Sequence, residues 1–168
     1  IVTNATTAPT DSIVHLVDED RHARQHLEQL LRSAYLPCRQ YPDAADLLGR
    51  LRDDRPGCVL LALRRPGQAG LQTQQSLGEA GFTLPLVFLS SAPRVSVAVR
   101  AMRAGAEDFL TTPVDDDILV ETLYRAIARD RRRKIRQHTR QRLSERLATL
   151  TPRERQTLEA VVAGLSNN

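Results

Sequence analysis

The sequence contains no tryptophan, and it has only three tyrosines, three phenylalanines, one methionine and two cysteines. Leu, Val, Ile and Ala must therefore fill any core, for which a hydrophobic content of 41% is sufficient. Two cysteines do not make a disulfide framework, so we expect a reducing, cytoplasmic environment. No apolar run approaches the ~20 residues that span a bilayer, which argues against a membrane partner. Residues 1–11 are polar without an apolar h-region, so we expect a disordered tail rather than a signal peptide.

Charge is distributed unevenly along the 168 residues. Residues 1–128 carry a net charge of −3, residues 129–146 carry +7 and residues 147–168 are neutral. A mildly acidic body with one basic segment is not typical of a domain that binds nucleic acid over its whole surface. We expect residues 129–150 to form a basic helical linker, which either contacts phosphates non-specifically or is simply solvated.

Strand and helix patterns alternate along the body of the chain. Short apolar runs predict strands at 13–17, 38–41, 58–63, 84–89 and 108–110. Helical patterns predict helices at 21–34, 44–51, 71–80, 93–104 and from about 115. Five βα units require a parallel sheet with helices on both faces. The predicted fold is α/β, a doubly wound, flavodoxin-like five-stranded sheet of order 2-1-3-4-5.

This strand order separates the two cysteines. Cys38 and Cys58 would lie two strand spacings apart, roughly 9–10 Å, which is too far for a disulfide. We therefore expect buried thiols.

The last helix is expected to be extended. From Ile118 no glycine or proline occurs until Pro152, and the intervening residues favour helix. Between Ile127 and Leu143 only Ile135 is apolar, so the middle has no face to bury. We expect one long helix that is packed at its start, basic in the middle and loosely coiled-coil-like at its end.

Polar residues gather at the predicted carboxyl edge of the sheet, where ligands bind in open α/β folds. The first strand is followed by three carboxylates, residues 18–20, which indicate a hard-metal site unless they only cap the next helix. The third strand ends at Ala62, which offers only a methyl group. Ser90 offers a hydroxyl at the end of the fourth strand. His15 is the one histidine expected near this cleft, and its mid-strand position indicates burial.

Five segments carry a resemblance to a known family: VHLVDED, GCVLLALRRPGQAG, LPLVFLSS, VAVRAMRAGAEDFLTTPVDDD and LTPRERQTLEAVVAGLSN. Together they resemble two-component response regulators of the FixJ type, with a CheY-like receiver domain at 12–128. Residues 151–168 resemble the first helix of a LuxR-type helix-turn-helix domain. The resemblance implies transcription regulation through a magnesium-dependent aspartyl phosphate, with a histidine kinase as a candidate partner. Because the chain stops before a recognition helix, we expect promoter DNA to be bound only through residues missing from it.

Several positions match the family's functional pattern. Asp18 and Glu19 match its metal-binding acids, Ser90 its switch hydroxyl and Phe109 its switch aromatic. The resemblance also implies a cis peptide before Pro113.

Two positions depart from the pattern. Ala62 stands where the phosphoacceptor aspartate is expected, and Thr112 stands where a lysine is expected. A methyl group cannot be phosphorylated or bind Mg²⁺, so we expect no cofactor, no enzymatic activity and at most a weak residual metal site at Asp18 and Glu19. Either the natural receiver is degenerate or an aspartate was engineered to alanine. The double loss and the neighbouring Arg64 favour the first.

Arg64 and Arg65 follow the altered position directly. One of them could reach Asp18 and Glu19 and replace the missing cation, or both could be solvated, as most charged side chains are.

The resemblance implies a homodimer. The surface expected to form it consists of Val95, Val99, Met102, Arg103, Phe109 and Leu119. The predicted function is a phosphorylation-independent response regulator whose receiver governs dimerisation of a DNA-binding domain. The alternative is a stand-alone adaptor receiver that binds proteins and no DNA.

Overall fold

The computed structural model describes residues 11–51, 54–64 and 69–165. The chain divides into two compact units, residues 1–131 and 132–168. Nearly all of the expected disordered tail lies outside the described residues. Within the described part of the chain, no helix is both long and apolar enough to cross a membrane.

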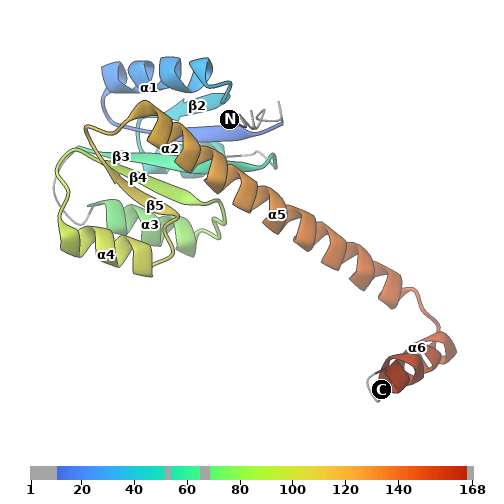
Figure 1. Ribbon diagram of the computed structural model, residues 1–168. Helices are drawn as coiled ribbons and strands as arrows, with labels where there is room; N and C mark the ends of the chain where they lie inside the picture. The colour runs from blue at the N-terminus through green and yellow to red at the C-terminus, as the bar shows by residue number, and fades with distance from the viewer. Residues whose placement is uncertain (1–10, 52–53, 65–68, 166–168) are drawn as a thin grey trace, which may run out of the picture. The chain divides into compact units, whose positions relative to one another are not determined.

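The first unit contains one parallel sheet (Figure 1). Its strands are β1 (Ile13–Val17), β2 (Cys38–Tyr41), β3 (Gly57–Leu63), β4 (Leu86–Ser90) and β5 (Asp108–Thr111). The order is β2-β1-β3-β4-β5, which confirms the predicted topology. Val14 on β1 is in register with Cys38 on one side and with Cys58 on the other. The thiols are free, as this separation predicts. Cys58 is buried as expected, whereas Cys38 at the edge strand is only half-buried, and burial raises the pKa of Cys38 to about 11.

Helices cover both faces of this sheet (Figure 1). They are α1 (Arg21–Ser33), α2 (Ala44–Arg50), α3 (Ala69–Glu79), α4 (Val95–Arg103) and the first half of α5 (Asp116–Ala148), whereas the last helix, α6 (Pro152–Leu165), belongs to the second unit. Alternate strand residues point to opposite faces, so the sheet supports two cores. The first half of α5 packs with α1 on one core, for example through Leu123 and Leu31. On the other face Leu47 of α2, Leu77 of α3 and Ala101 of α4 pack together.

Most helices of the first unit begin close to the residue that the sequence predicts. The Asp20 carboxylate accepts hydrogen bonds from the amides of His22 and Ala23, and so caps α1. The prediction that α4 begins at Pro93 is wrong. The N-cap is Arg94, whose extended backbone (φ −114°, ψ 126°) leaves Pro93 in the preceding turn.

A buried carboxylate ties α5 to the sheet. Asp130 is fully buried, and its Oδ2 accepts a hydrogen bond of 3.0 Å from the amide of Gly57 at the start of β3. Gly57 has to be glycine, because a Cβ there would lie 2.5 Å from the carbonyl oxygen of Ile13. The expectation that α5 buries nothing beyond Ile127 is therefore wrong for one further turn. A charged residue was assumed to be solvated, whereas here it satisfies a buried backbone amide.

The second unit holds the remainder of α5 and α6. Residues such as Ile135 and Leu143 are exposed on this part of α5. The loop before α6 forms a capping box. The Thr151 amide donates to Glu154 Oε2 at 2.8 Å, and the Glu154 amide donates to Thr151 Oγ1 at 3.4 Å. The first of these hydrogen bonds lowers the pKa of Glu154.

Candidate functional site

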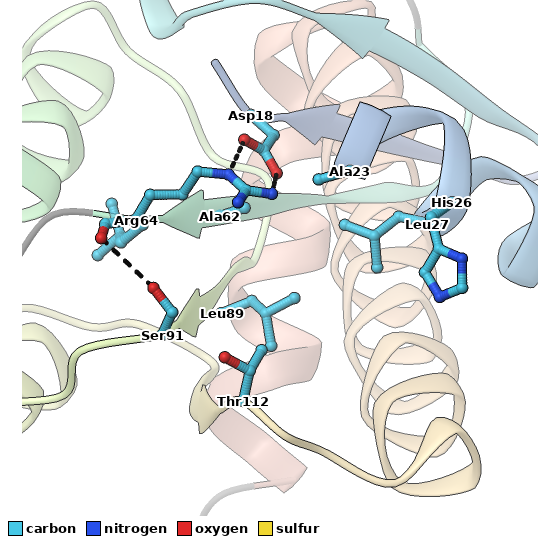
Figure 2. Close-up of a pocket in the computed structure, with 10 residues that line it drawn as sticks. Asp18, Ala23, His26, Leu27, Ala62, Arg64, Leu89, Ser91 and Thr112 are labelled. Atoms are coloured by element: carbon cyan, nitrogen blue, oxygen red, sulfur yellow. Dashed lines mark hydrogen bonds and ion pairs between the residues drawn. The ribbon is translucent and has the colours of Figure 1, made fainter. Parts of the chain in front are cut away.

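A cavity of about 190 Å³ lies at the carboxyl edge of the sheet (Figure 2). It is lined by Asp18, Ala23, His26, Leu27, Ala62, Leu63, Arg64, Leu89, Ser91 and Thr112. These residues come from the ends of β1, β3, β4 and β5 and from the first turns of α1. The cavity therefore lies where the topology of a doubly wound sheet places a ligand.

Ala62 is one of the residues that line this cavity. It lies near the end of β3, in register with Leu89 on β4. Both residues line the cavity, as Figure 2 shows. A methyl group supplies neither a nucleophile nor a metal ligand, so this position has no group that could accept a phosphoryl group.

Arg64 binds Asp18 through two hydrogen bonds. Its Nε lies 2.9 Å from Asp18 Oδ1, and its Nη2 lies 3.2 Å from Asp18 Oδ2 (Figure 2). The Asp18 side chain is 1% exposed, whereas that of Arg64 is 44% exposed. The hydrogen bond to Asp18 raises the pKa of Arg64, so the guanidinium is charged at every physiological pH. The pair therefore places the positive charge of Arg64 beside a carboxylate that is buried away from water.

Other groups complete the surroundings of Asp18. The amide of Asp20 donates to Asp18 Oδ1 at 2.9 Å, and Arg24 donates through Nη1 to the Asp18 carbonyl. Arg64 Nη1 also lies 3.4 Å from Asp20 Oδ2. The pKa of Asp20 is lowered mainly by its hydrogen bonds with the amides of Ala23 and His22, with a smaller contribution from Arg64.

The sequence hypothesis placed an arginine against both Asp18 and Glu19. The structure places Arg64 against Asp18 and Asp20 instead, while Glu19 is exposed and does not line the cavity. The second acid differs because Asp20 lies at the start of α1, where its side chain turns back over the strand end. Arg65 lies outside the described residues.

Of the expected switch residues, Thr112 lines the cavity, whereas Ser90 and Phe109 do not. Thr112 lines the cavity, and its peptide bond to Pro113 is cis, as the resemblance implied. Ser90 is buried, and its neighbour Ser91 lines the cavity instead, with its hydroxyl donating to the Arg64 carbonyl at 3.3 Å. Phe109 stacks on Phe88 with ring centroids 5.6 Å apart.

His26 corrects the expectation about histidines. His15 is buried as predicted and hydrogen-bonds the Tyr41 hydroxyl at 3.0 Å. His26 nevertheless lines the cavity from α1. The sequence contained a signal for this placement, because His26 lies three residues after Ala23 and one before Leu27. Positions i, i+3 and i+4 share a helix face.

Four of the six residues of the expected dimer surface are exposed, whereas Phe109 is half-buried against the core and Leu119 is buried. Val95 is 82% exposed, and Val99 and Met102 are also exposed on α4. Leu119 is only 1% exposed and belongs to the core, so assigning it to the surface was wrong. Leu119 and Leu123 are four residues apart on the face of α5 that packs against the sheet, whereas Ile118 is exposed.

The residues at this edge do not fit Mg²⁺. Ala62 supplies no oxygen, and both carboxylate oxygens of Asp18 are engaged by Arg64. Among the described residues, no three His, Cys, Asp or Glu side chains are grouped so that they could hold a metal ion. Mg²⁺ requires near-octahedral oxygen ligation, which one exposed carboxylate beside an arginine cannot provide.

Comparison with known proteins gives consistent matches. Residues 14–124 match the profile described as the response regulator receiver domain. Nodulation protein W of Bradyrhizobium diazoefficiens is 35% identical over 162 residues, covering 96% of this chain and 71% of that protein. The transcriptional regulatory protein TdiR of Thauera aromatica is 37% identical over 163 residues, covering 97% and 72%.

Solved structures agree. The response regulator StyR superposes with a TM-score of 0.82 at 30% identity, covering 92% of this chain and 78% of that one. Full-length FixJ from B. japonicum superposes with a TM-score of 0.65 at 32% identity, covering 93% and 77%. The profile thus matches only the first compact unit, whereas these relatives match parts of both.

Proposed function

The chain belongs to the response regulator receiver family, and from this premise we propose that it is the receiver of a transcription regulator that works without phosphorylation. The relatives include proteins named as transcriptional regulators. These relatives are transcription regulators rather than enzymes. The cavity of this chain offers no nucleophile at residue 62.

One observation carries this proposal: Ala62 and the Arg64–Asp18 pair occupy the same site. In the family that the sequence resembles, an aspartate, a metal ion and a lysine act together on the phosphoryl group. Here a methyl group replaces the first, a guanidinium occupies the acid that would hold the second, and Thr112 replaces the third. The two substitutions, together with the arginine that occupies Asp18, support a receiver in which an internal cation takes the place of the metal ion.

The output proposed for this receiver is dimerisation. The exposed apolar side chains of α4, including Val95 and Val99, support a homodimer through this face. In this proposal α6 is the first helix of a LuxR-type DNA-binding domain, and promoter contacts come from residues beyond this chain. An adaptor that binds another protein through the same face is the competing function.

Phosphodonor treatment tests the proposal. The purified chain is incubated with acetyl phosphate and Mg²⁺, then analysed by intact mass and by sedimentation equilibrium. We expect no phosphoryl adduct and no change in association state. An adduct that forms with Mg²⁺ and alters sedimentation would show that another residue accepts phosphate, and the proposal would fail.

Two variants separate a degenerate receiver from an engineered one. If only one aspartate had been removed from a working site, Ala62→Asp alone would restore phosphorylation. We expect Ala62→Asp to remain unphosphorylated, because Arg64 still occupies Asp18 and no lysine is present. Ala62→Asp combined with Thr112→Lys and Arg64→Met is the matched reconstruction in which an adduct is expected.

A further inference from the structure

The cavity around Ala62 is large enough for a ring-sized molecule. A cavity of ~150 Å³ lined by apolar side chains binds benzene, and this one measures about 190 Å³. Half of its lining residues are apolar: Ala23, Leu27, Ala62, Leu63 and Leu89. An aspartate at position 62 would place a carboxylate in this lining, whereas the methyl group keeps it apolar there.

The charged groups of the cavity favour an uncharged ligand. Asp18 and Arg64 are the oppositely charged pair in its lining, and they neutralise each other at 2.9 Å. An anion in the cavity would approach the Asp18 carboxylate, and a cation would approach the Arg64 guanidinium. Either ion would also lose hydration on entering a largely apolar space, which costs free energy unless a partner compensates.

The two hydroxyl groups of the lining lie on one side of this space. Figure 2 shows Ser91 and Thr112 beside Leu89, while His26 and Leu27 lie on the α1 side. The Ser91 hydroxyl already donates to the Arg64 carbonyl. The Thr112 hydroxyl makes no recorded hydrogen bond to another described residue, so it can donate to or accept from a ligand.

We infer that this cavity binds a small uncharged molecule that combines one ring with one hydroxyl or carbonyl oxygen, the oxygen lying toward Thr112. Pockets of this kind are mostly apolar with a few polar groups that fix orientation. The inference rests on the proposed function, because a receiver that is not controlled by phosphate needs another input. A ligand here contacts residues of α1 and at the ends of β3, β4 and β5. Its binding can therefore be coupled to the positions of all four elements.

Three probes of matched size test the ligand class: benzyl alcohol, benzoate and benzylammonium. Each is titrated into the ¹⁵N-labelled chain, and amide chemical shifts are followed by NMR. We expect benzyl alcohol to give saturable shifts at the cavity residues, with the two ions binding at least about tenfold more weakly, a difference of ~1.4 kcal/mol. Absence of saturation for every probe, or tighter binding of either ion, would overturn the inference.

Two variants locate the site. Ala62→Leu fills part of the cavity and should weaken benzyl alcohol binding at least about tenfold. Thr112→Val preserves shape on an exposed residue and should weaken binding roughly fivefold by removing one hydrogen bond. Thr111→Val, one residue earlier and outside the cavity lining, is the matched control and should bind like the wild type. Equal binding by Thr112→Val and the control would contradict the assigned orientation.

The two proposals fail separately. A phosphoryl adduct on the wild-type chain refutes phosphorylation independence, whatever the NMR titration shows. A titration without saturable binding, alongside an unphosphorylated chain, refutes only the ligand site.

Discussion

At the scale of single residues, Arg64 decides what the carboxyl edge of the sheet can bind. Its guanidinium meets Asp18 with two parallel hydrogen bonds, the geometry in which arginine recognises carboxylates best. Asp18 is buried, so Arg64 supplies hydrogen bonds that water cannot give to this carboxylate. Arg64 itself is partly exposed, and water therefore screens part of the attraction.

Arg64→Met should expose this dependence. Methionine keeps an aliphatic side chain but leaves the Asp18 carboxylate without its cation, so we expect the free energy of unfolding to fall by about 1–2 kcal/mol. The variant should also become more stable when Mg²⁺ is added, because Asp18 and Asp20 then lack their shared guanidinium and attract another cation. Urea unfolding with and without Mg²⁺ measures both effects.

Arg39→Met is the control for this experiment. Arg39 is exposed on β2 and makes no recorded ion pair with a described residue, so its loss should change neither stability nor the response to Mg²⁺. Wild-type stability that rises with Mg²⁺ as strongly as that of Arg64→Met would contradict the role given to Arg64.

At the scale of secondary-structure elements, α5 is held at two levels. Leu119 and Leu123 bury its first turns in the core. Asp130, further along, supplies an acceptor for the amide at the start of β3. The second contact fixes which turn of α5 is the last to lie against the sheet.

Asp130→Ala should therefore loosen the end of the packed part of α5. The Gly57 amide would be left buried without its acceptor, which costs about 1–3 kcal/mol. Hydrogen exchange should report faster exchange at Gly57 and at α5 amides near residue 130, with the other amides of the core strands unaffected. Glu145→Ala, on the exposed part of α5, should leave both stability and exchange unchanged.

At the scale of the whole molecule, association depends on which apolar side chains remain outside the core. Val95, Val99 and Met102 stay exposed on α4, although the sheet has two well-filled cores. Leaving such side chains in water is unfavourable unless a partner covers them.

Val99→Asp should weaken self-association. In a symmetric dimer each copy would bring a new carboxylate to the same face, so we expect the dissociation constant to rise at least about tenfold. Sedimentation equilibrium measures this directly. Tyr35→Asp, at another strongly exposed residue outside α4, should leave association unchanged. An identical mass distribution for all three proteins would place the interface elsewhere.

The sheet order and the positions of Ala62 and Asp18 could be predicted because alternating apolar runs determine the topology, and topology brings strand ends together. The partners of Arg64 could not be chosen between Glu19 and Asp20, because that choice depends on the side-chain directions at the start of α1. The burial of Asp130 was invisible for a related reason. Its partner is a backbone amide 73 positions earlier in the chain. Every residue except proline has such an amide, so the sequence does not single out this one.

The methyl group of Ala62 also changes the kind of thermodynamics available to this protein. A covalently modified receiver can be held away from equilibrium, since its occupancy reflects the ratio of two opposing reactions that consume a high-energy donor. In the proposed function, a methyl group at that position leaves reversible association as the input. The population of any active conformation then follows the concentration of what binds and its preference between two states, and a preference of about 5.5 kcal/mol is needed to reverse a 99:1 balance. The output of such a receiver follows the present concentration of its ligand and does not depend on earlier signals.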